Sequence, residues 1–490
     1  YIYPLFTFAG FVPLLALNEI YNNSSIKKRE FKFLSFLYLS FLGWNFITTW
    51  WIINSTILGA MLAFFINSLL MCLPFLFSRY VNKIFNRFYP KLVSDYWLIP
   101  FWITFEYVHL NWDLTWSWLN LGNSFAYAHY FVQWYEITGI LGGTLWILCI
   151  NILVFKLISE KNTGVPQKEI FIIASIITLP CFISLIRYFT YVEKGTDTEI
   201  VVVQPNIDPY NEKFPGTPRF LAFGKQMERL ISLSEKKITP QTKFVLWPET
   251  SLPVGFDEDL IEDQGYIKEV RALVDRHPQI TVLTGADTYK IYLSEYDKTE
   301  TARYGEGVGF YDYFNTALHI EKDRKIKIYH KSKLVPGVEK MPYPGLFKWV
   351  ENFSIDLGGI TGSLGIQDKR DVFFNKEKIG GAPVICYESI FGAYVGEYIK
   401  NGASFIAIIT NDGWWGNTPG HKQHLQFARL RSLETRRSIA RAANTGISGF
   451  INQRGDILAS NNYWVEDAMS LKIKTNNEGL TFYTKYCDYI

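Results

Sequence analysis

The chain has 490 residues, of which 48% are hydrophobic, 17% are aromatic and only 19% are charged. The apolar content excludes an intrinsically disordered chain, and the net charge of +3 gives no reason to expect a nucleic-acid-binding protein. Five cysteines without a C-x-x-C pair exclude a disulfide scaffold and the common zinc ribbons. The H-E-x-x-H, Walker A and G-x-G-x-x-G patterns of zinc proteases, P-loop proteins and dinucleotide-binding proteins are also absent.

The first 195 residues are predicted to form a helical membrane domain. Residues 33–78 contain no Asp, Glu, Lys or Arg, which is enough for two transmembrane helices of about 20 residues each. A buried core helix would explain one short apolar run, but not six runs in 195 residues. We predict spans at 1–18, 32–53, 56–78, 92–109, 136–156 and 169–191.

The connecting loops predict the orientation of these spans. Eleven basic residues follow the first, third and fifth spans, whereas the loops at 54–56 and 110–135 contain no Lys or Arg. Because cytoplasmic loops are enriched in Lys and Arg, the chain after the sixth span is expected to lie outside the cytoplasm. The first visible helix would then run from outside to inside, and since the chain begins with Tyr1 we expect one more span before it. The basic residues are Lys27, Lys28, Arg29, Lys32, Arg79, Lys83, Arg87, Lys91, Lys156, Lys161 and Lys168.

From residue 196 the pattern changes to that of a soluble α/β domain, because short β-branched runs alternate with charged amphipathic stretches. Strands are predicted at 200–204, 243–247, 280–284, 314–320, 326–330, 383–386 and 405–410. Helices are predicted at 218–236, 257–276, 389–400 and 421–443. The Gly-, Pro- and aromatic-rich loop at 340–366 has neither period, and loops of this length are usually functional or disordered.

Three residues at predicted strand ends carry reactive groups. Cys386 ends one strand just before a helix, where a thiolate is favoured, whereas the other four cysteines lie in predicted spans or near the end of the chain. Glu249 follows a strand that Pro248 ends, and Lys331 closes a third strand. Taken singly, Cys386 could be an ordinary buried side chain, Glu249 an exposed carboxylate in a turn, and Lys331 a surface lysine. Together they place a thiol, a carboxylate and an amine where strand ends can converge at one sheet edge.

The motifs around these residues resemble the nitrilase superfamily. They are Trp247-Pro-Glu-Thr250, Tyr329-His-Lys331 before Leu334-Val-Pro336, and Ile385-Cys-Tyr-Glu388. Together with the N-terminal spans, they resemble the apolipoprotein N-acyltransferase family specifically. Further similar motifs are Gln204-Pro-Asn206, Asn411-Asp-Gly-Trp-Trp-Gly416, Ala442-Ala-Asn-Thr-Gly-Ile-Ser448, Trp118-Leu-Asn-Leu-Gly-Asn123 and Gln133-Trp-Tyr-Glu-Ile-Thr-Gly139. One departure is Pro336-Gly-Val-Glu339, where the family usually has Pro-Phe-Gly-Glu.

The resemblance implies a multi-span α-helical membrane domain followed by an extracytoplasmic α/β domain with the nitrilase-like α-β-β-α sandwich. The expected boundaries are 1–195 for the membrane domain and 196–480 for the catalytic domain. Residues 481–490 would then lead into a C-terminal span that lies beyond Ile490.

The resemblance also implies a ping-pong acyl transfer from a phospholipid to the α-amine of a diacylated apolipoprotein. Glu249 is expected to act as general base and Cys386 as nucleophile. Lys331 and the backbone N–H of Tyr387 are expected to stabilise the oxyanion. Glu339 matches the second glutamate of the family, and Glu388 and Trp414 are expected to support the site.

This reading implies no metal or organic cofactor, no nucleic acid, a monomer, and a location in the bacterial inner membrane with the catalytic domain on the periplasmic side. Two alternatives remain open. A membrane-bound nitrilase-type amidase would use the same triad, with water as second nucleophile. A non-enzymatic scaffold or transporter would carry a relic domain, although its three catalytic side chains are intact.

Other groups receive weaker interpretations. His421 and His424 lie three apart without a third ligand, so no metal site is predicted there. A solvated or sheet-packing helix face is expected for Arg429, Arg431, Arg436, Arg437 and Arg441, with attraction to lipid head groups as the alternative. Either mobile arms near lipid or ordinary core packing would explain the aromatic residues Tyr210, Phe214, Phe220, Phe223, Tyr343, Phe347 and Trp349.

Overall fold

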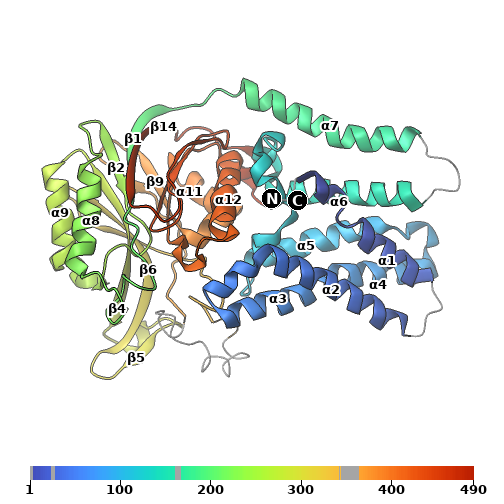
Figure 1. Ribbon diagram of the computed structural model, residues 1–490, viewed down its shortest axis with the longest axis horizontal. Coiled ribbons are helices and arrows are strands. Elements are labelled where there is room, and N and C mark those ends of the chain that lie inside the picture. The colour runs from blue at the N-terminus through green and yellow to red at the C-terminus, as the bar shows by residue number, and fades with distance from the viewer. Residues whose placement is uncertain (1–3, 24–27, 160–166, 342, 344–362) are drawn as a thin grey trace. The chain divides into compact units, whose positions relative to one another are not determined.

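The computed structural model describes residues 4–23, 28–159, 167–341, 343 and 363–490 (Figure 1). The chain divides into two units. A helical unit contains Tyr1–Ile53, Ile57–Tyr191 and Tyr486–Ile490, and a second unit contains Asn54–Thr56 and Val192–Lys485. All strands of the described residues belong to the second unit, which we call the α/β unit.

The helical unit contains five described stretches that are long and apolar enough to cross a membrane: Pro4–Asn22, Arg29–Asn54, Gly59–Phe88, Tyr135–Ser159 and Gln167–Thr190. They agree with five of the six predicted spans. The α-helices of this unit are α1 Val12–Asn23, α2 Arg29–Thr49, α3 Ile57–Met71, α4 Leu73–Phe88, α5 Leu98–Asn111, α6 Tyr135–Ser159 and α7 Gln167–Thr190.

The span expected at 92–109 differs from the prediction. Two short 3-10 segments, Pro90–Leu92 and Asp95–Trp97, precede α5, which begins only at Leu98. With 14 residues, α5 is about 21 Å long, which is shorter than the roughly 30 Å hydrocarbon core of a bilayer. The apolar composition suggested a span, but Pro90 and the capping Ser94 interrupt the helix on its N-terminal side.

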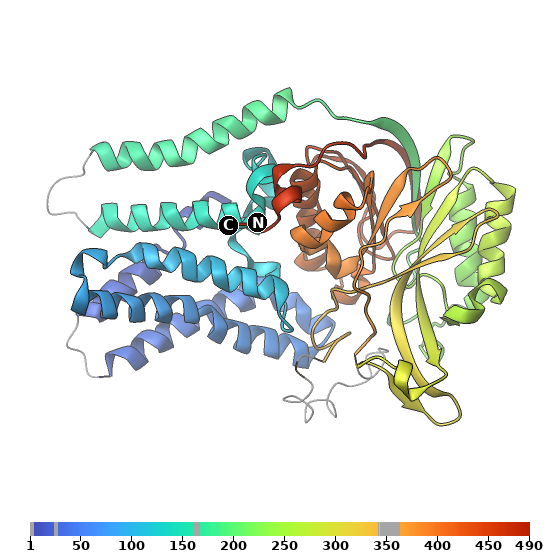
Figure 2. The ribbon, with the colours of Figure 1, turned by 180° about the vertical axis from the view of Figure 1, so that it is seen from behind.

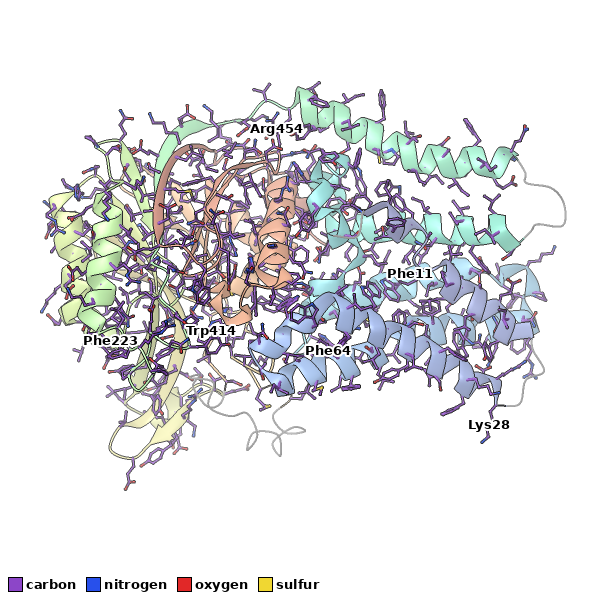
Figure 3. All side chains as sticks on the ribbon, viewed as in Figure 1. Phe11, Lys28, Phe64, Phe223, Trp414 and Arg454 are labelled. Atoms are coloured by element: carbon purple, nitrogen blue, oxygen red, sulfur yellow. The ribbon has the colours of Figure 1, made fainter. Side chains whose placement is uncertain are left out.

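Aromatic side chains fill the interior of the helical unit, and one buried carboxylate connects its helices by hydrogen bonds. The ring of Phe11, labelled with Phe64 in Figure 3, lies 4.7 Å from that of Trp102. Glu106 on α5 accepts hydrogen bonds from Thr144 Oγ1 at 2.6 Å and from the backbone N–H of Leu121 at 2.8 Å. This carboxylate therefore ties α5 to α6 and to the 3-10 segment Leu121–Phe131.

The α/β unit contains two β-sheets. The first has eight strands, in the order β14-β1-β2-β4-β6-β5, with β3 beside β4 and β7 beside β6. The second has six strands, in the order β13-β12-β11-β10-β9-β8. The strands of the first sheet are β1 Thr196–Gln204, β2 Thr242–Leu246, β3 Gly255–Asp257, β4 Thr281–Tyr292, β5 Arg303–Gly305, β6 Gly309–Glu321, β7 Lys327–His330 and β14 Asp467–Thr475. Those of the second are β8 Phe373–Phe374, β9 Gly380–Ile385, β10 Phe405–Thr410, β11 Ile439–Ala443, β12 Gly449–Ile451 and β13 Ile457–Ser460.

The two sheets pack face to face between two layers of helices (Figures 1 and 2). Helices α8 Phe223–Glu235 and α9 Gly265–Arg276 cover the first sheet, and their buried Leu230 and Val270 join its core. Helix α11 Gly392–Lys400 packs on β9 and against α12 Pro419–Thr435. Between the sheets, the rings of Phe244 and Phe405 lie 5.0 Å apart. This layering confirms the α-β-β-α sandwich.

The helix predicted at 421–443 is wrong in its second half. Helix α12 ends at Thr435, Arg436 adopts a left-handed backbone with φ of 51°, and Ile439–Ala443 forms the central strand β11. The β-branched Ile439 and the alternating small residues Ala440 and Ala442 fit a strand with other strands on both sides.

The arginines of this segment are not solvated. Arg431, Arg437 and Arg441 are fully buried, and Arg436 is nearly so. Arg431 pairs with Glu434 at 2.7 Å, and Arg437 donates to the backbone oxygen of Gly479 at 3.0 Å. Of the expected alternatives, packing inside the sandwich is correct for these four side chains.

Candidate functional site

Glu249 is held in a tight loop after β2. The backbone N–H of Trp247 still pairs with Leu283 on β4 at 2.9 Å, and Gly285 donates to the carbonyl of Pro248 at 3.0 Å. A Cβ on Gly285 would lie 2.6 Å from the Cα of Glu249, so only glycine permits this approach. The loop therefore fixes a nearly buried carboxylate at the carboxyl end of β2.

Lys331 follows β7, and its backbone N–H donates to the carbonyl of Asn315 on β6 at 2.8 Å. Its side chain is 1% exposed, and Nζ lies 2.9 Å from Oε1 of Glu249 and 2.7 Å from Oε1 of Glu339. Burial alone would lower the pKa of this lysine, but the two carboxylates outweigh it and raise the pKa well above its usual range. The site therefore holds a permanent ammonium between two glutamates.

Cys386 follows β9 and opens the 3-10 segment Cys386–Ile390. Its φ of 48° lies in the left-handed region, which a non-glycine residue occupies at a cost of about 1–3 kcal/mol. Burial, and secondarily the charge of Glu249, raise the pKa of the thiol above its usual range. The expectation that this position favours a resting thiolate is therefore wrong, and a base must take the proton as the sulfur reacts.

The electrostatic field around Cys386 links it to Lys331 and Glu249. The Lys331 ammonium favours the thiolate, whereas the Glu249 carboxylate opposes it. The three residues follow the carboxyl ends of β2, β7 and β9. They were expected at one sheet edge, but β2 and β7 belong to the first sheet and β9 to the second, so the cluster forms between the two sheets of the sandwich.

Glu339 ends the unusual Pro336-Gly-Val-Glu339 segment and is the second carboxylate beside Lys331. Its Oε2 accepts the backbone N–H of Val335 at 2.9 Å, while Oε1 accepts from Lys331. Gly337 has a φ of 79°, so this residue provides the left-handed turn that the loop requires.

Asn315 is a site residue that the sequence reasoning missed. Its Nδ2 lies 2.8 Å from Oε1 of Glu249 and 3.2 Å from Oε1 of Glu339. The amide therefore supports the same two carboxylates as Lys331. Nothing in the sequence of β6 singled it out, because Asp312, Thr316 and His319 are polar residues of the same strand.

Glu388 follows Cys386 by two positions and is fully buried. Its Oε2 accepts the backbone N–H of Ile385 and its Oε1 that of Ser332, both at 2.8 Å. Oε1 also accepts from the hydroxyls of Tyr329 at 2.8 Å and Tyr394 at 2.6 Å. Burial raises the pKa of Glu388 to about 7, although the two backbone donors lower it. Glu388 thereby links the turn of Cys386 to the segment that follows Lys331.

The other two residues expected to support the site, Tyr387 and Trp414, each contact an aromatic side chain. Tyr387 follows the nucleophile directly, and its ring lies 5.1 Å from that of Phe391. Trp414, labelled in Figure 3, lies in the 3-10 turn Asp412–Trp415, and its backbone oxygen accepts a hydrogen bond from the hydroxyl of Tyr210 at 3.0 Å. The rings of these two residues are 5.2 Å apart.

The aromatic residues predicted as arms are only partly described. Tyr210, Phe220 and Tyr343 are 37–40% exposed, so core packing does not account for them. Phe220 and Phe223 form a perpendicular ring pair at 5.2 Å, and Figure 3 shows Phe223 at the start of α8. Phe347 and Trp349 lie outside the described residues.

No group of three or more His, Cys, Asp or Glu in the described part of the chain has the arrangement of a metal site. The residues present instead form a thiol, a carboxylate base and a buried ammonium, which together suit nucleophilic acyl chemistry at a carbonyl group.

Two family models match the chain. The model described as "Apolipoprotein N-acyltransferase N-terminal domain" matches residues 1–153, and that described as "Carbon-nitrogen hydrolase" matches residues 200–480. The second match alone covers more than half of the chain.

Individual proteins match over most of their length. The apolipoprotein N-acyltransferase of Chlorobaculum tepidum is 30% identical over 462 residues, which cover 92% of this chain and 84% of that protein. That of Rickettsia bellii is 28% identical, covering 84% and 73%. Apolipoprotein N-acyltransferase 1 of Treponema denticola is 26% identical, covering 97% and 87%. Among solved structures, Nit3 of Saccharomyces cerevisiae aligns at a TM-score of 0.39 and 14% identity, covering 58% of this chain and 92% of that chain.

Proposed function

The chain belongs to the apolipoprotein N-acyltransferase family of the nitrilase superfamily, and from this premise we propose how it works. It transfers an acyl chain from a membrane phospholipid, through a thioester on Cys386, to the α-amino group of the N-terminal S-diacylglyceryl cysteine of an apolipoprotein. The observation that carries the proposal is the convergence of Glu249, Lys331 and Cys386 in one buried cluster.

In the first half-reaction, Glu249 removes the proton of Cys386 as the sulfur attacks the ester carbonyl of the phospholipid. A C–S bond forms, and the ester C–O bond breaks. The proton on Glu249 passes to the departing alkoxide, which leaves as lysophospholipid. General-base assistance is required here because the buried thiol has a raised pKa.

In the second half-reaction, the α-amine of the diacylated cysteine attacks the thioester carbonyl. Glu249 accepts the proton of the amine, a C–N bond forms and the C–S bond breaks. The departing thiolate of Cys386 takes the proton back, so the enzyme returns to its starting state without any change of oxidation level.

Two donors would stabilise the negative oxygen in both half-reactions. The Lys331 ammonium is buried and permanently charged, and such a donor in a water-poor site commonly contributes several kcal/mol. The backbone N–H of Tyr387 is proposed as the second donor, because Tyr387 directly follows Cys386 in the 3-10 segment Cys386–Ile390.

We also propose that the protein is a monomer in the bacterial inner membrane, with its α/β unit on the periplasmic side. The five long apolar helices support the membrane location, and the eleven basic residues in alternate loops support the orientation. Lipid substrates would reach the site from the membrane, with the exposed aromatics Tyr210, Phe220 and Tyr343 contacting acyl chains.

The experiment that tests the proposal separates transfer from hydrolysis. With phospholipid alone, the purified protein should release one equivalent of lysophospholipid and then stop. Adding a diacylglyceryl-cysteinyl peptide with a free N-terminus should restart turnover and yield the triacylated peptide, whereas the N-acetylated peptide should not. Continuous release of fatty acid without peptide would instead support the amidase-like hydrolase.

A further inference from the structure

A second chain of side-chain contacts lies behind Cys386 and has no part in the half-reactions above. It consists of His424 on α12, Asp412 after β10 and Ser389 in the 3-10 segment that Cys386 opens. Nδ1 of His424 lies 3.0 Å from Oδ1 of Asp412, and Nε2 lies 2.9 Å from Oγ of Ser389. All three side chains are at most 1% exposed, so they are shielded from bulk solvent.

One end of this chain reaches the backbone of the nucleophile. The hydroxyl of Ser389 donates to the carbonyl oxygen of Cys386 at 2.7 Å, and Nε2 of His424 lies 3.2 Å from the same oxygen. Both contacts are made to the backbone of Cys386, whose φ of 48° lies in the left-handed region. Such a backbone persists only where neighbouring contacts hold it in place.

The other end of the chain reaches the general base. Asp412 directly follows Asn411, whose backbone N–H donates to Oε2 of Glu249 at 3.1 Å. Asp412 itself accepts from Thr410 Oγ1 at 2.9 Å and from Arg441 at 2.5 Å. The nucleophile and the base are therefore connected through His424.

Charged groups fix the orientation of the His424 ring. Nδ1 lies 3.0 Å from Oδ1 of Asp412 and 3.2 Å from a guanidinium nitrogen of Arg441, and Nε2 faces Ser389 and the backbone of Cys386. Burial alone would raise the pKa of Asp412, but Arg441 and His424 outweigh it and hold that pKa well below its usual range. The ionised Asp412 and Arg441 thus hold the Nδ1 edge of the ring, and the Nε2 edge is turned toward Ser389 and Cys386.

We propose that His424 is a positioning residue that, with Ser389 and Asp412, holds the Cys386 peptide in its left-handed conformation and in register with Glu249. It touches no substrate atom in this reading and acts through the backbone of the nucleophile. The inference rests on the proposed function, because it concerns the rate at which Cys386 is acylated.

The chain offers a matched control on the same helix. His421 lies one turn before His424 and is also fully buried, but its ring stacks on Tyr463 at 3.9 Å. If burial of an imidazole in α12 were the whole explanation, replacing either histidine would have the same effect on Cys386.

The test compares His424→Asn, His424→Gln, Ser389→Ala and His421→Gln in the full-length protein in phospholipid nanodiscs. Single-turnover acylation of Cys386 is followed by intact-protein mass spectrometry, and alkylation of Cys386 by iodoacetamide is measured without added phospholipid. Glutamine places its amide near the position of Nε2, whereas asparagine places it near Nδ1. We expect His424→Asn to lower the saturating acylation rate by about 10- to 100-fold, because small misplacements of reacting groups cost that much. The half-saturating phospholipid concentration should not change.

His424→Gln should recover most of the rate, Ser389→Ala should slow acylation, and His421→Gln should react like the wild type. Slower iodoacetamide alkylation in His424→Asn than in His421→Gln supports the inference even if the wild type forms no acyl adduct, which would contradict only the proposed function. Wild-type alkylation and acylation rates in His424→Asn would overturn the inference. If His424→Asn does not fold, Ser389→Ala decides, and unchanged rates in that variant would overturn it too.

Discussion

Replacing Lys331 by methionine removes the cation that two buried glutamates share. Nζ lies 2.9 Å from Glu249 and 2.7 Å from Glu339, and the lysine side chain is 1% exposed. Methionine fills a similar volume but leaves the carboxylates side by side without a counter-charge. Removing one partner of a buried ion pair typically costs about 3–5 kcal/mol. For a unit of this size, that loss corresponds to a melting temperature lower by roughly 5–15 °C.

Thermal unfolding followed by tryptophan fluorescence in detergent measures this loss, and intact mass spectrometry of the same samples measures the acyl adduct on Cys386. Adding Glu339→Gln to Lys331→Met removes one of the two uncompensated charges, so the double variant should regain part of its stability but no acylation. Lys333→Met is the control, because the ammonium of Lys333 lies 4.9 Å over the ring of Phe391. A wild-type melting temperature in Lys331→Met, or normal acylation in it, would refute the reasoning about the buried ammonium.

Three further predictions concern topology, pH dependence and the supporting amide. A reporter that works only outside the cytoplasm should be active when fused at residue 196 and inactive at residue 85; the reverse would contradict the orientation. Because Glu388 binds its proton more tightly in the folded state, with a pKa of about 7 against 4.5, its contribution to stability is present below pH 4.5 and is lost as pH rises through about 7. The melting temperature of Glu388→Gln should therefore fall less between these pH values than that of the wild type, and equal slopes would argue against the raised pKa. Asn315→Leu removes the amide that supports Glu249, so it should lower the unfolding free energy by about 1–3 kcal/mol and slow acylation, and unchanged acylation would show that this amide is dispensable.

Cys386, Glu249 and Lys331 could be singled out in the sequence because each follows a recognisable strand within a distinctive motif. The expected convergence at one sheet edge is wrong, since Glu249 and Lys331 follow strands of the first sheet and Cys386 follows a strand of the second. The left-handed conformation of Cys386 and the raised pKa of its thiol were not predictable, since both depend on residues distant in sequence.

Supporting residues were harder to predict for a physical reason. Asn315 is one of several polar residues in β6, and its partners are 66 and 24 positions away. His424 contacts Ser389 over 35 positions, so helical spacing from His421 said nothing about its role. The buried arginines explain why the helix was predicted to continue to residue 443, although α12 ends at Thr435. Charged side chains are rarely fully buried, and the ion pairs that allow it here cannot be read from the sequence.

The central claim is that Cys386 carries the acyl chain, and the most direct measurement is the mass of the protein after incubation with phospholipid. The wild type should gain the mass of one acyl chain, located on Cys386 by peptide mapping and removed by hydroxylamine, as a thioester requires. Cys386→Ala should gain nothing, and Glu249→Gln should gain the adduct far more slowly. An adduct on another residue, or turnover to triacylated peptide by Cys386→Ala, would contradict the account.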